Sequence, residues 1–333
     1  MLRIFTSLLI VIVINGCHDK SKSNSQFQHN IEGENRPWKH ERFDNANNKF
    51  SFAIFSDLTG GERPEIFKVA VEQLNLLRPE FIINVGDLIE GADSIPEDWH
   101  RQWDDFDNRA GKATAPIFYM GGNHDLTGHI ARQVWKTRLG PRYYHFRYKD
   151  VLFLFFDTED NADERMAEIE QMREVALQDL EEGGWDAFWQ SEYANIPERT
   201  SGTVSKAQAD YFINVIEENK DVRWTFVLIH KPAWQKADEE NFIRVEMALK
   251  DMPYTVFNGH THIYKYTQRH GHDYINLSTT GGHQFPDRGP SFDHITWVTV
   301  DNSGATIANL KMGGILNKTG QIPLSGDTLI FEH

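Results

Sequence analysis

The sequence predicts an α/β protein, because apolar runs of strand length alternate with segments whose apolar residues recur at helical spacing. A run over 50–55 is followed by helical spacing over 64–77 and by a second short apolar run over 81–85. A strand, a helix and a strand of these lengths form a βαβ unit, in which the two strands pair in parallel through a right-handed crossover.

The same alternation continues along the chain. Helices are expected over 99–110, 163–182, 205–219 and 239–250, and strands over 116–120, 224–229 and 254–258. Two aromatic runs on either side of Lys149-Asp150 indicate a hairpin. Further hairpins are expected over 263–277 and 295–310, and the chain contains no internal repeat.

The segment 183–201 interrupts this pattern. It carries two glycines, Pro197 and several aromatic residues, which are typical of an irregular insertion and of a lid over a site. Its aromatic residues Trp185, Trp189 and Tyr193, together with Trp234, either line a substrate pocket or pack the segment onto the domain. The sequence leaves both alternatives open.

The N-terminus has the pattern of a secretion signal. Met1-Leu2-Arg3 precedes an apolar run over 4–14, which is shorter than the ~20 residues that a membrane-spanning helix needs. The segment Ile14-Asn15-Gly16-Cys17 resembles the cleavage box of bacterial lipoproteins, which implies a signal peptide over 1–16 and acylation of Cys17. Cys17 is the only cysteine, so no internal disulfide can form. An ordinary secretion signal with an incidental cysteine is the alternative.

Composition sets the expected boundaries and excludes one class of partner. Residues 17–48 are polar and lack apolar periodicity, so we expect a flexible tether there, a folded domain over 49–312 and a C-terminal tail over 313–333. The lipoprotein resemblance implies a bacterial cell-envelope location, on the periplasmic side or at the outer membrane, with membrane contact through the anchor alone. A formal charge of −15 argues against nucleic-acid binding by a basic surface.

Residues of the types that bind metals follow five of the predicted strands: Asp57, Asp87, Asn123, His230 and His260. Because ligands of α/β sheets bind where the carboxyl ends of strands meet, these side chains are expected to converge. Carboxylates, a carboxamide and imidazoles suit Mn, Fe or Zn. Two such ions ~3.5–4 Å apart can hold a hydroxide between them and neutralise phosphoryl oxygens.

Five short motifs, taken in order, resemble those of calcineurin-like metallophosphoesterases: Ser56-Asp57-Leu58-Thr59, Gly86-Asp87, Gly122-Asn123-His124-Asp125, His230-Lys231-Pro232 and Gly259-His260-Thr261-His262. The resemblance covers about residues 50–312. It implies a four-layer α/β/β/α sandwich of two mixed sheets flanked by helices. It also implies hydrolysis of a phosphomonoester or phosphodiester by a hydroxide that bridges two divalent metal ions.

The same resemblance implies roles for individual residues. Asp57 and His262 would bind the first metal, and Asp87 would bridge. The second metal would be bound by Asn123, His230 and His260. His124 would lie beside the phosphoryl group and assist the leaving oxygen, with Asp125 orienting its other ring nitrogen.

The first motif departs from the family pattern, which commonly has a histidine where this chain has Thr59. Glu90, three residues after the bridging Asp87, is a candidate replacement ligand, and a solvated loop carboxylate is the equally weighted alternative. Thr59-Gly60-Gly61 could instead form a tight turn whose backbone amides bind phosphate.

A phosphate-ester-binding lipoprotein with weakened or lost catalysis is the competing function. A first metal site weakened at Thr59 would favour it. The pair His124-Asp125 favours the enzyme, because in the family these residues serve the chemistry rather than metal binding.

Overall fold

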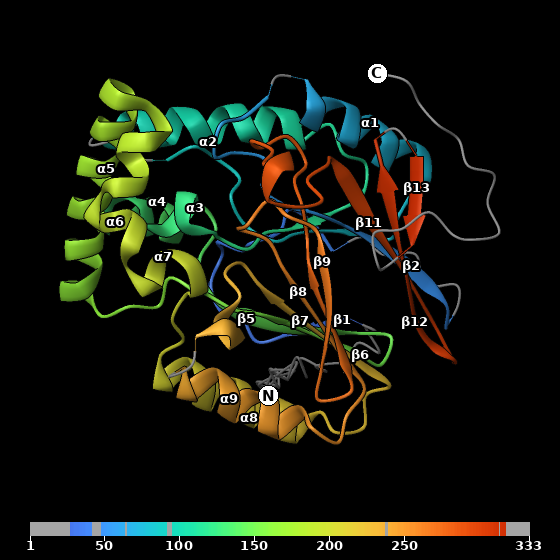
Figure 1. Ribbon diagram of the computed structural model, residues 1–333. Helices are drawn as coiled ribbons and strands as arrows, with labels where there is room; N and C mark the ends of the chain where they lie inside the picture. Colours follow the sequence, from blue (N-terminus) through green and yellow to red (C-terminus); the bar gives the residue numbers. More distant parts are fainter. Residues whose placement is uncertain are drawn as a thin grey trace, which may run out of the picture.

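Two β-sheets lie face to face with helices on both outer sides, which confirms the predicted four-layer α/β/β/α arrangement (Figure 1). The computed structural model describes residues 27–41, 48–63, 65–91, 95–236, 239–312 and 314–317. Within these ranges no helix is both long and apolar enough to cross a lipid bilayer.

The first sheet has six strands in the order β13-β12-β11-β2-β3-β4. Its parallel part contains β2 (Phe50–Phe55), β3 (Ile82–Asn84) and β4 (Ile117–Phe118), and helix α1 (Ile66–Leu77) connects the first two. This is the predicted βαβ unit. The antiparallel part contains β11 (His294–Asp301), β12 (Gly304–Lys311) and β13 (Gly314–Asn317).

The second sheet has seven strands in the order β1-β5-β6-β7-β8-β10-β9. Four of them are parallel: β6 (Val151–Phe155), β7 (Trp224–Ile229), β8 (Tyr254–Asn258) and β10 (His272–Asn276). The antiparallel members are β1 (Phe27–His29), β5 (Tyr144–Tyr148) and β9 (Lys265–Arg269). The β5–β6, β9–β10 and β11–β12 hairpins lie where the sequence predicts them.

Alternation along the strands builds separate cores on the two faces of each sheet. In β2, Phe52 and Ile54 join a phenylalanine-rich core between the sheets, whereas Ala53 and Phe55 pack in the core beneath α1. Phe52 and Phe81 stack in the inner core with ring centroids 5.2 Å apart. Close packing of this kind makes the strand ends a rigid support for a site.

Helices cover the outer face of each sheet with amphipathic surfaces. Buried residues of α1, α2 (Pro96–Ala110) and α4 (His129–Arg138) pack on the first sheet, and those of α8 (Lys206–Glu218) and α9 (Glu240–Leu249) pack on the second. The side chain of Ser205 caps α8 by accepting a hydrogen bond from the Gln208 amide.

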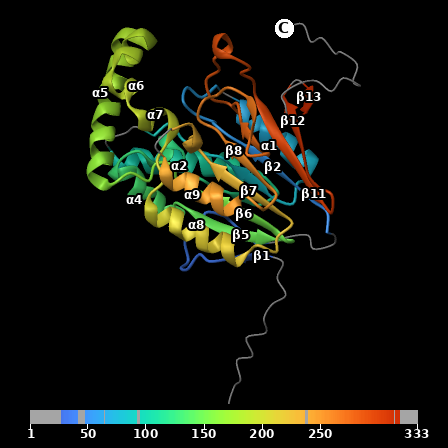
Figure 2. The ribbon, with the colours of Figure 1, turned by 60° about the horizontal axis from the view of Figure 1, so that its bottom comes forward.

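The predicted irregular insertion over 183–201 is largely helical. Helix α5 runs over Asp163–Gln190 with a break at Gly184, where φ is 71°, and is followed by α6 (Glu192–Asn195) and α7 (Pro197–Ser201). The Gly183-Gly184 pair lowers helix propensity locally without preventing the helix from resuming. Figure 2 shows these helices standing to one side of the two sheets.

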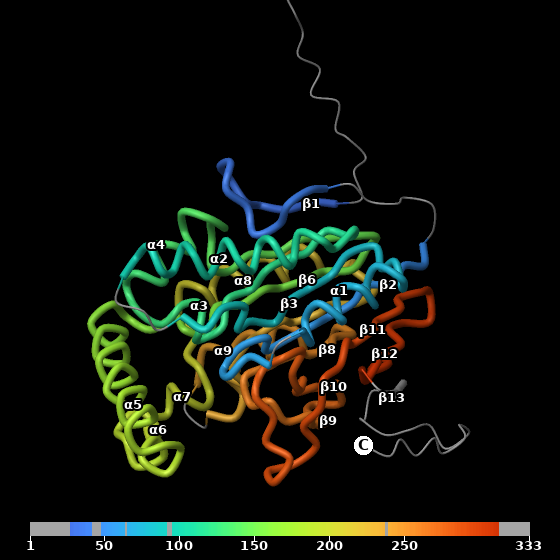
Figure 3. Tube along the Cα trace, turned by 90° about the horizontal axis from the view of Figure 1, so that it is seen from above, coloured from blue at the N-terminus to red at the C-terminus, as the bar shows by residue number. Residues whose placement is uncertain are grey.

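Both predicted domain boundaries need correction. Phe27–His29 pairs with β5 at the sheet edge, and Trp38 is only 4% exposed, so part of the predicted tether belongs to the domain (Figure 3). Isolated apolar residues in a polar stretch give no periodicity, which explains the error. Residues 314–317 extend the first sheet beyond 312. The predicted signal peptide and Cys17 lie outside the described residues.

Candidate metal centre

The six side chains predicted as metal ligands meet at one edge of the two sheets. Each of five strands ends just before one of them: β2 before Asp57, β3 before Asp87, β4 before Asn123, β7 before His230 and β8 before His260. His262 follows two residues after the last of these. Strands from both sheets therefore supply the site, as expected for the carboxyl edge of parallel strands.

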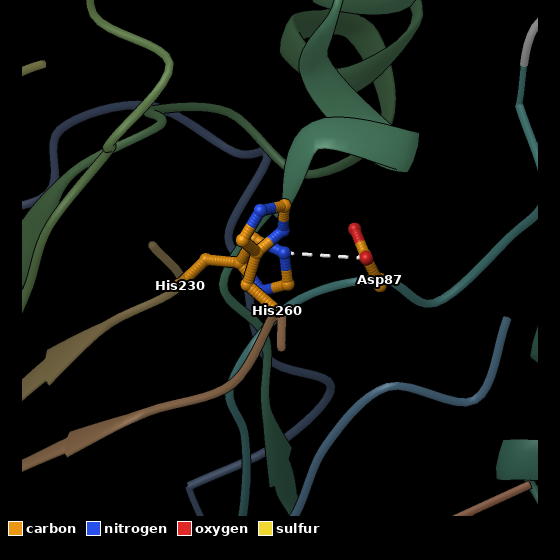
Figure 4. Close-up of side chains that lie close together, drawn as sticks. All are labelled: Asp87, His230 and His260. Carbon is orange, nitrogen blue, oxygen red and sulfur yellow. Dashed lines mark ion pairs between the residues drawn. The ribbon is translucent and has the colours of Figure 1, made fainter. Parts of the chain in front are cut away.

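The ligands form two groups that share Asp87. One contains Asp87, His230 and His260, and the other contains Asp57, Asp87 and His262. Within each group the candidate ligand atoms lie within 4.8 Å of one another. Figure 4 shows the first group, with an ion pair between Asp87 and His230 at 3.2 Å. A carboxylate common to both groups has the position of a bridging ligand.

Asn123 completes the first of these groups. Its Oδ1 lies 3.2 Å from Nε2 of His230, in the first turn of the short helix α3 (Asn123–Leu126). The carboxamide oxygen is thus directed to the same ring nitrogen that faces Asp87, so one cation could contact all three side chains.

Backbone carbonyls fix the orientation of all three histidines. The hydrogen bonds run from Nδ1 of His230 to Val85, from Nε2 of His260 to Arg199, and from Nδ1 of His262 to His283. Because a carbonyl can only accept, each bonded nitrogen carries a proton, so the other ring nitrogen is the one that can bind a metal when the imidazole is neutral. This arrangement is typical of metal-binding histidines.

The two aspartates are held in a similar way. Asp57 accepts hydrogen bonds from the Ser56 hydroxyl at 2.5 Å and from the His260 amide at 2.9 Å. Asp87 accepts one from the His124 amide at 3.0 Å. The amides that order these carboxylates come from the neighbouring ligand loops, which links the loops to one another.

The glycines that precede three ligands are required by space. A methyl group at Gly86 would overlap the His230 ring, one at Gly122 would overlap Asp87, and one at Gly259 would overlap Asp57. Four ligands also have a positive φ, from 52° to 73°: Asp57, Asp87, His260 and His262. Aspartate and histidine adopt this conformation more readily than most L-residues, and such positions cluster at functional sites.

Electrostatics in the metal-free protein show a site suited to cations. Burial alone would lower the pKa of His230, but the nearby Asp87 and Asp57 raise it to about 9. Burial opposes ionisation of Asp87, yet His230 and His124 hold its pKa well below the usual range. A proton on His230 thus partly neutralises the buried carboxylates. Together with two carboxylates, a carboxamide and three imidazoles, this environment fits two divalent cations.

We expect metal binding to release a proton. His230 is protonated below about pH 9, and a metal ligand must be neutral, so the apparent Kd should fall about tenfold per pH unit between pH 6 and 8. Calorimetric titration of the metal-free protein with Zn²⁺ in buffers of different ionisation enthalpy measures the number of protons released. Release of none at pH 7 would contradict the assignment of His230 as a ligand.

His124 lies at the edge of this centre and belongs to neither group. Its Nδ1 donates to the Glu90 carbonyl at 2.7 Å, and the guanidinium of Arg173 lies 3.3 Å from the same nitrogen. Nε2 is therefore the nitrogen left for a substrate. Arg173 was not predicted, because nothing in its acidic helical segment distinguishes it from a surface cation.

The predicted role of Asp125 differs from the one found. Its buried carboxylate accepts backbone hydrogen bonds from Leu88, Ile89 and Gly122, at 2.8 to 3.2 Å. It therefore ties the loop after Asp87 to the start of α3, and the Glu90 carbonyl takes the orienting position beside His124. The resemblance implies that the Asp125 carboxylate faces the His124 ring, but its oxygens are directed to these three backbone amides instead.

Glu90 forms hydrogen bonds with the turn that begins at Thr59-Gly60-Gly61. From the sequence, Glu90 is a candidate metal ligand and this turn is a candidate phosphate-binding element. The Glu90 carboxylate accepts hydrogen bonds from the amides of Gly60, Gly61 and Glu62, at 2.8 to 3.1 Å. Thr59 donates its hydroxyl to the Ile89 carbonyl at 2.9 Å. Glu90 is in neither ligand group, and its metal-binding role stays a prediction.

Replacing Glu90 with Ala distinguishes the two roles. If the carboxylate serves the turn, the amides of residues 60–62 should exchange hydrogen roughly tenfold faster, with no change in metals bound per chain. Hydrogen exchange and elemental analysis of the same preparation provide both readouts. Loss of one metal with unchanged exchange would instead identify Glu90 as the replacement ligand.

A pocket of about 530 Å³ opens beside the ligands. Trp185, Trp189 and Tyr193 line it, whereas Trp234 packs against Tyr274. Both alternatives apply to Tyr193 and Trp189, which also pack in a small core of the α5–α6 segment. Three arginines that the sequence did not indicate also line it: Arg173, Arg199 and Arg288. They are far apart in the chain, so only the tertiary fold identifies them as a group.

The fold and the centre together define a class, the metal-dependent hydrolases of phosphate esters. The family model of calcineurin-like phosphoesterases matches residues 50–264, and the chain belongs to that family. It is therefore a metallophosphoesterase.

Solved structures support the fold. A dimetal phosphatase from Danio rerio is similar with a TM-score of 0.56 and 14% identity, over 82% of this chain and 99% of that one. The structure of PhoD is similar with a TM-score of 0.51 and 11% identity, over 89% of this chain and 74% of that one. No curated protein sequence matches the chain.

Proposed function

We propose that this protein hydrolyses a phosphomonoester or phosphodiester with two divalent cations held by the six ligands. The observation that carries the proposal is the sharing of Asp87 between two ligand groups. Asp57 and His262 would complete the first site, and Asn123, His230 and His260 the second. Mn, Fe or Zn fits this mixture of oxygen and nitrogen donors.

Two cations so placed would acidify a water molecule and offset the charge of the phosphoryl oxygens. His124 then protonates the leaving oxygen through Nε2, because its Nδ1 is held by the Glu90 carbonyl. Asp125 supports this geometry indirectly, by fixing the backbone between Asp87 and α3. Arg173, buried beside His124, adds positive charge where an anionic substrate would bind.

Substituting Asp87 and His124 separates metal binding from chemistry. Asp87→Asn should lose both metals and all turnover, because the bridging charge is removed. His124→Ala should keep both metals and lose rate by ~100-fold or more. Elemental analysis and hydrolysis of p-nitrophenyl and bis-p-nitrophenyl phosphate measure the two properties.

Asp105→Asn, at a largely exposed carboxylate on α2, is the matched control and should change neither property. Equal metal loss in the Asp87 and His124 variants would refute the assignment of Asp87 to metal binding and of His124 to the chemical step. Two metals without turnover of either ester, across Mn, Fe, Zn and Mg, would favour the competing function of a phosphate-ester-binding protein.

We also propose that the protein is anchored in a bacterial cell envelope through an acylated Cys17, with its substrate outside the cytoplasm. The apolar run over 4–14 and the lone cysteine after Gly16 support this. Cys17→Ser should abolish incorporation of labelled palmitate and move the protein from the membrane to the soluble fraction, with the same hydrolytic activity. Palmitate labelling that persists in this variant would refute the anchor.

A further inference from the structure

The pocket beside the metal centre has two walls of different character. One wall contains metal ligands and His124. The other is built mainly from α5, α6 and α7 and from the turn η2 (Pro286–Arg288), and it is rich in aromatic residues and arginine. A volume of about 530 Å³ is typical of sites for whole small molecules and much larger than a phosphoryl group requires.

Two arginines on the second wall share one aromatic ring. The guanidinium carbon of Arg199 lies 4.6 Å from the ring centroid of Trp189, and that of Arg288 lies 4.4 Å from the same centroid. Arg288 also lies 4.7 Å from the centroid of Phe285. Such cation–π contacts do not satisfy the N–H donors of either guanidinium, which can still bind an anion.

Neither Arg199 nor Arg288 has a carboxylate within ion-pair distance among the residues that the structure describes. This is notable in a chain of charge −15, where other arginines are paired, such as Arg165 with Glu198 and Arg269 with Glu246. Burial and the nearby Arg288 both lower the pKa of Arg199, a sign of charge repulsion that a bound anion would relieve.

A flat apolar surface lies next to this pair. Trp185 stacks on Trp189 with centroids 5.8 Å apart and planes inclined by 22°. Trp185 lines the pocket and remains 41% exposed. An exposed indole beside cations suits a ligand with a planar ring of its own.

The second wall is fixed relative to the metal ligands. The backbone carbonyl of Arg199 accepts the hydrogen bond from His260, and the preceding carbonyl of Glu198 accepts one from the buried Lys231 at 2.8 Å. Lys231 also forms an ion pair with the buried Glu159. The backbone at Arg199 is therefore held at a defined place beside the metal ligands.

From these contacts we propose that the substrate is a small phosphoester whose leaving group joins a planar ring to a second anionic group. The ring packs against Trp185, and the second anion binds Arg199 and Arg288. The proposal rests on the proposed function, since the phosphoryl end must bind at the metal centre.

Matched substrates test the proposal on the metal-loaded full chain. We compare phenyl phosphate with 4-carboxyphenyl phosphate, and 2-naphthyl phosphate with 6-carboxy-2-naphthyl phosphate. A charge-assisted contact with an arginine predicts that kcat/KM for at least one carboxylated ester exceeds that of its partner by roughly tenfold or more. The two ring sizes cover two distances between the phosphate and the carboxylate.

Arg199→Gln and Arg288→Gln should each reduce this preference roughly fivefold or more. Because each ester has the same leaving group in every variant, a comparison between variants is free of differences in leaving-group reactivity. Arg101→Gln, at a mostly exposed arginine on α2, is the charge-matched control and should keep the preference. A preference that is absent, or that survives in both pocket variants, overturns the proposal while leaving phosphoesterase activity established. No turnover of any ester would instead count against the proposed function.

A second readout does not depend on turnover. Saturation-transfer NMR on the chelator-treated full chain should detect 2-naphthoate binding, but not the uncharged 2-acetylnaphthalene at the same concentration. Arg288→Gln should reduce the 2-naphthoate signal severalfold, and Arg101→Gln should leave it intact. Equal signals from both compounds, or from both variants, would overturn the second anion site.

Discussion

The buried carboxylate of Asp87 is the interaction on which the centre depends. It is 1% exposed, is shared by both ligand groups and accepts a hydrogen bond from the His124 amide. Its negative charge is compatible with burial because imidazoles lie around it and the His124 amide orders it. The two sheets make this possible, since they bring strand ends that are distant in sequence to one edge. The close-packed aromatic core between the sheets holds these strand ends in fixed positions relative to one another.

Much of the fold and of the ligand set could be predicted from the sequence, because the relevant information is local. An apolar run followed by Gly-Asp, Gly-Asn or Gly-His predicts a strand, a backbone position without space for a side chain and a metal ligand, all within a few residues. The glycines prove necessary for a spatial reason, as a methyl group at Gly122 would overlap Asp87. The apolar run over 50–55 likewise predicted the strand β2.

The errors concern residues whose environment is set by distant parts of the chain. Phe27 and Trp38 lack any pattern, and their burial is decided by pairing with β5 and packing on Phe118. Asp125 lies next to His124 in sequence, yet three amides from two loops determine where its carboxylate points. Glu90 is a different case, because its metal-binding role stays a prediction, and only the fold reveals that its carboxylate oxygens accept hydrogen bonds from the amides of residues 60–62.

The hydrogen bond from His260 to the Arg199 carbonyl connects the metal centre to the α5–α7 segment. The α5–α7 segment shapes the pocket, and the same segment sets the ring orientation of a candidate metal ligand. Changes in this segment that alter which esters are accepted will therefore also alter how tightly the cations are held. Selectivity and metal affinity are coupled traits here, and a graft of this segment from a relative must carry a carbonyl to the same place.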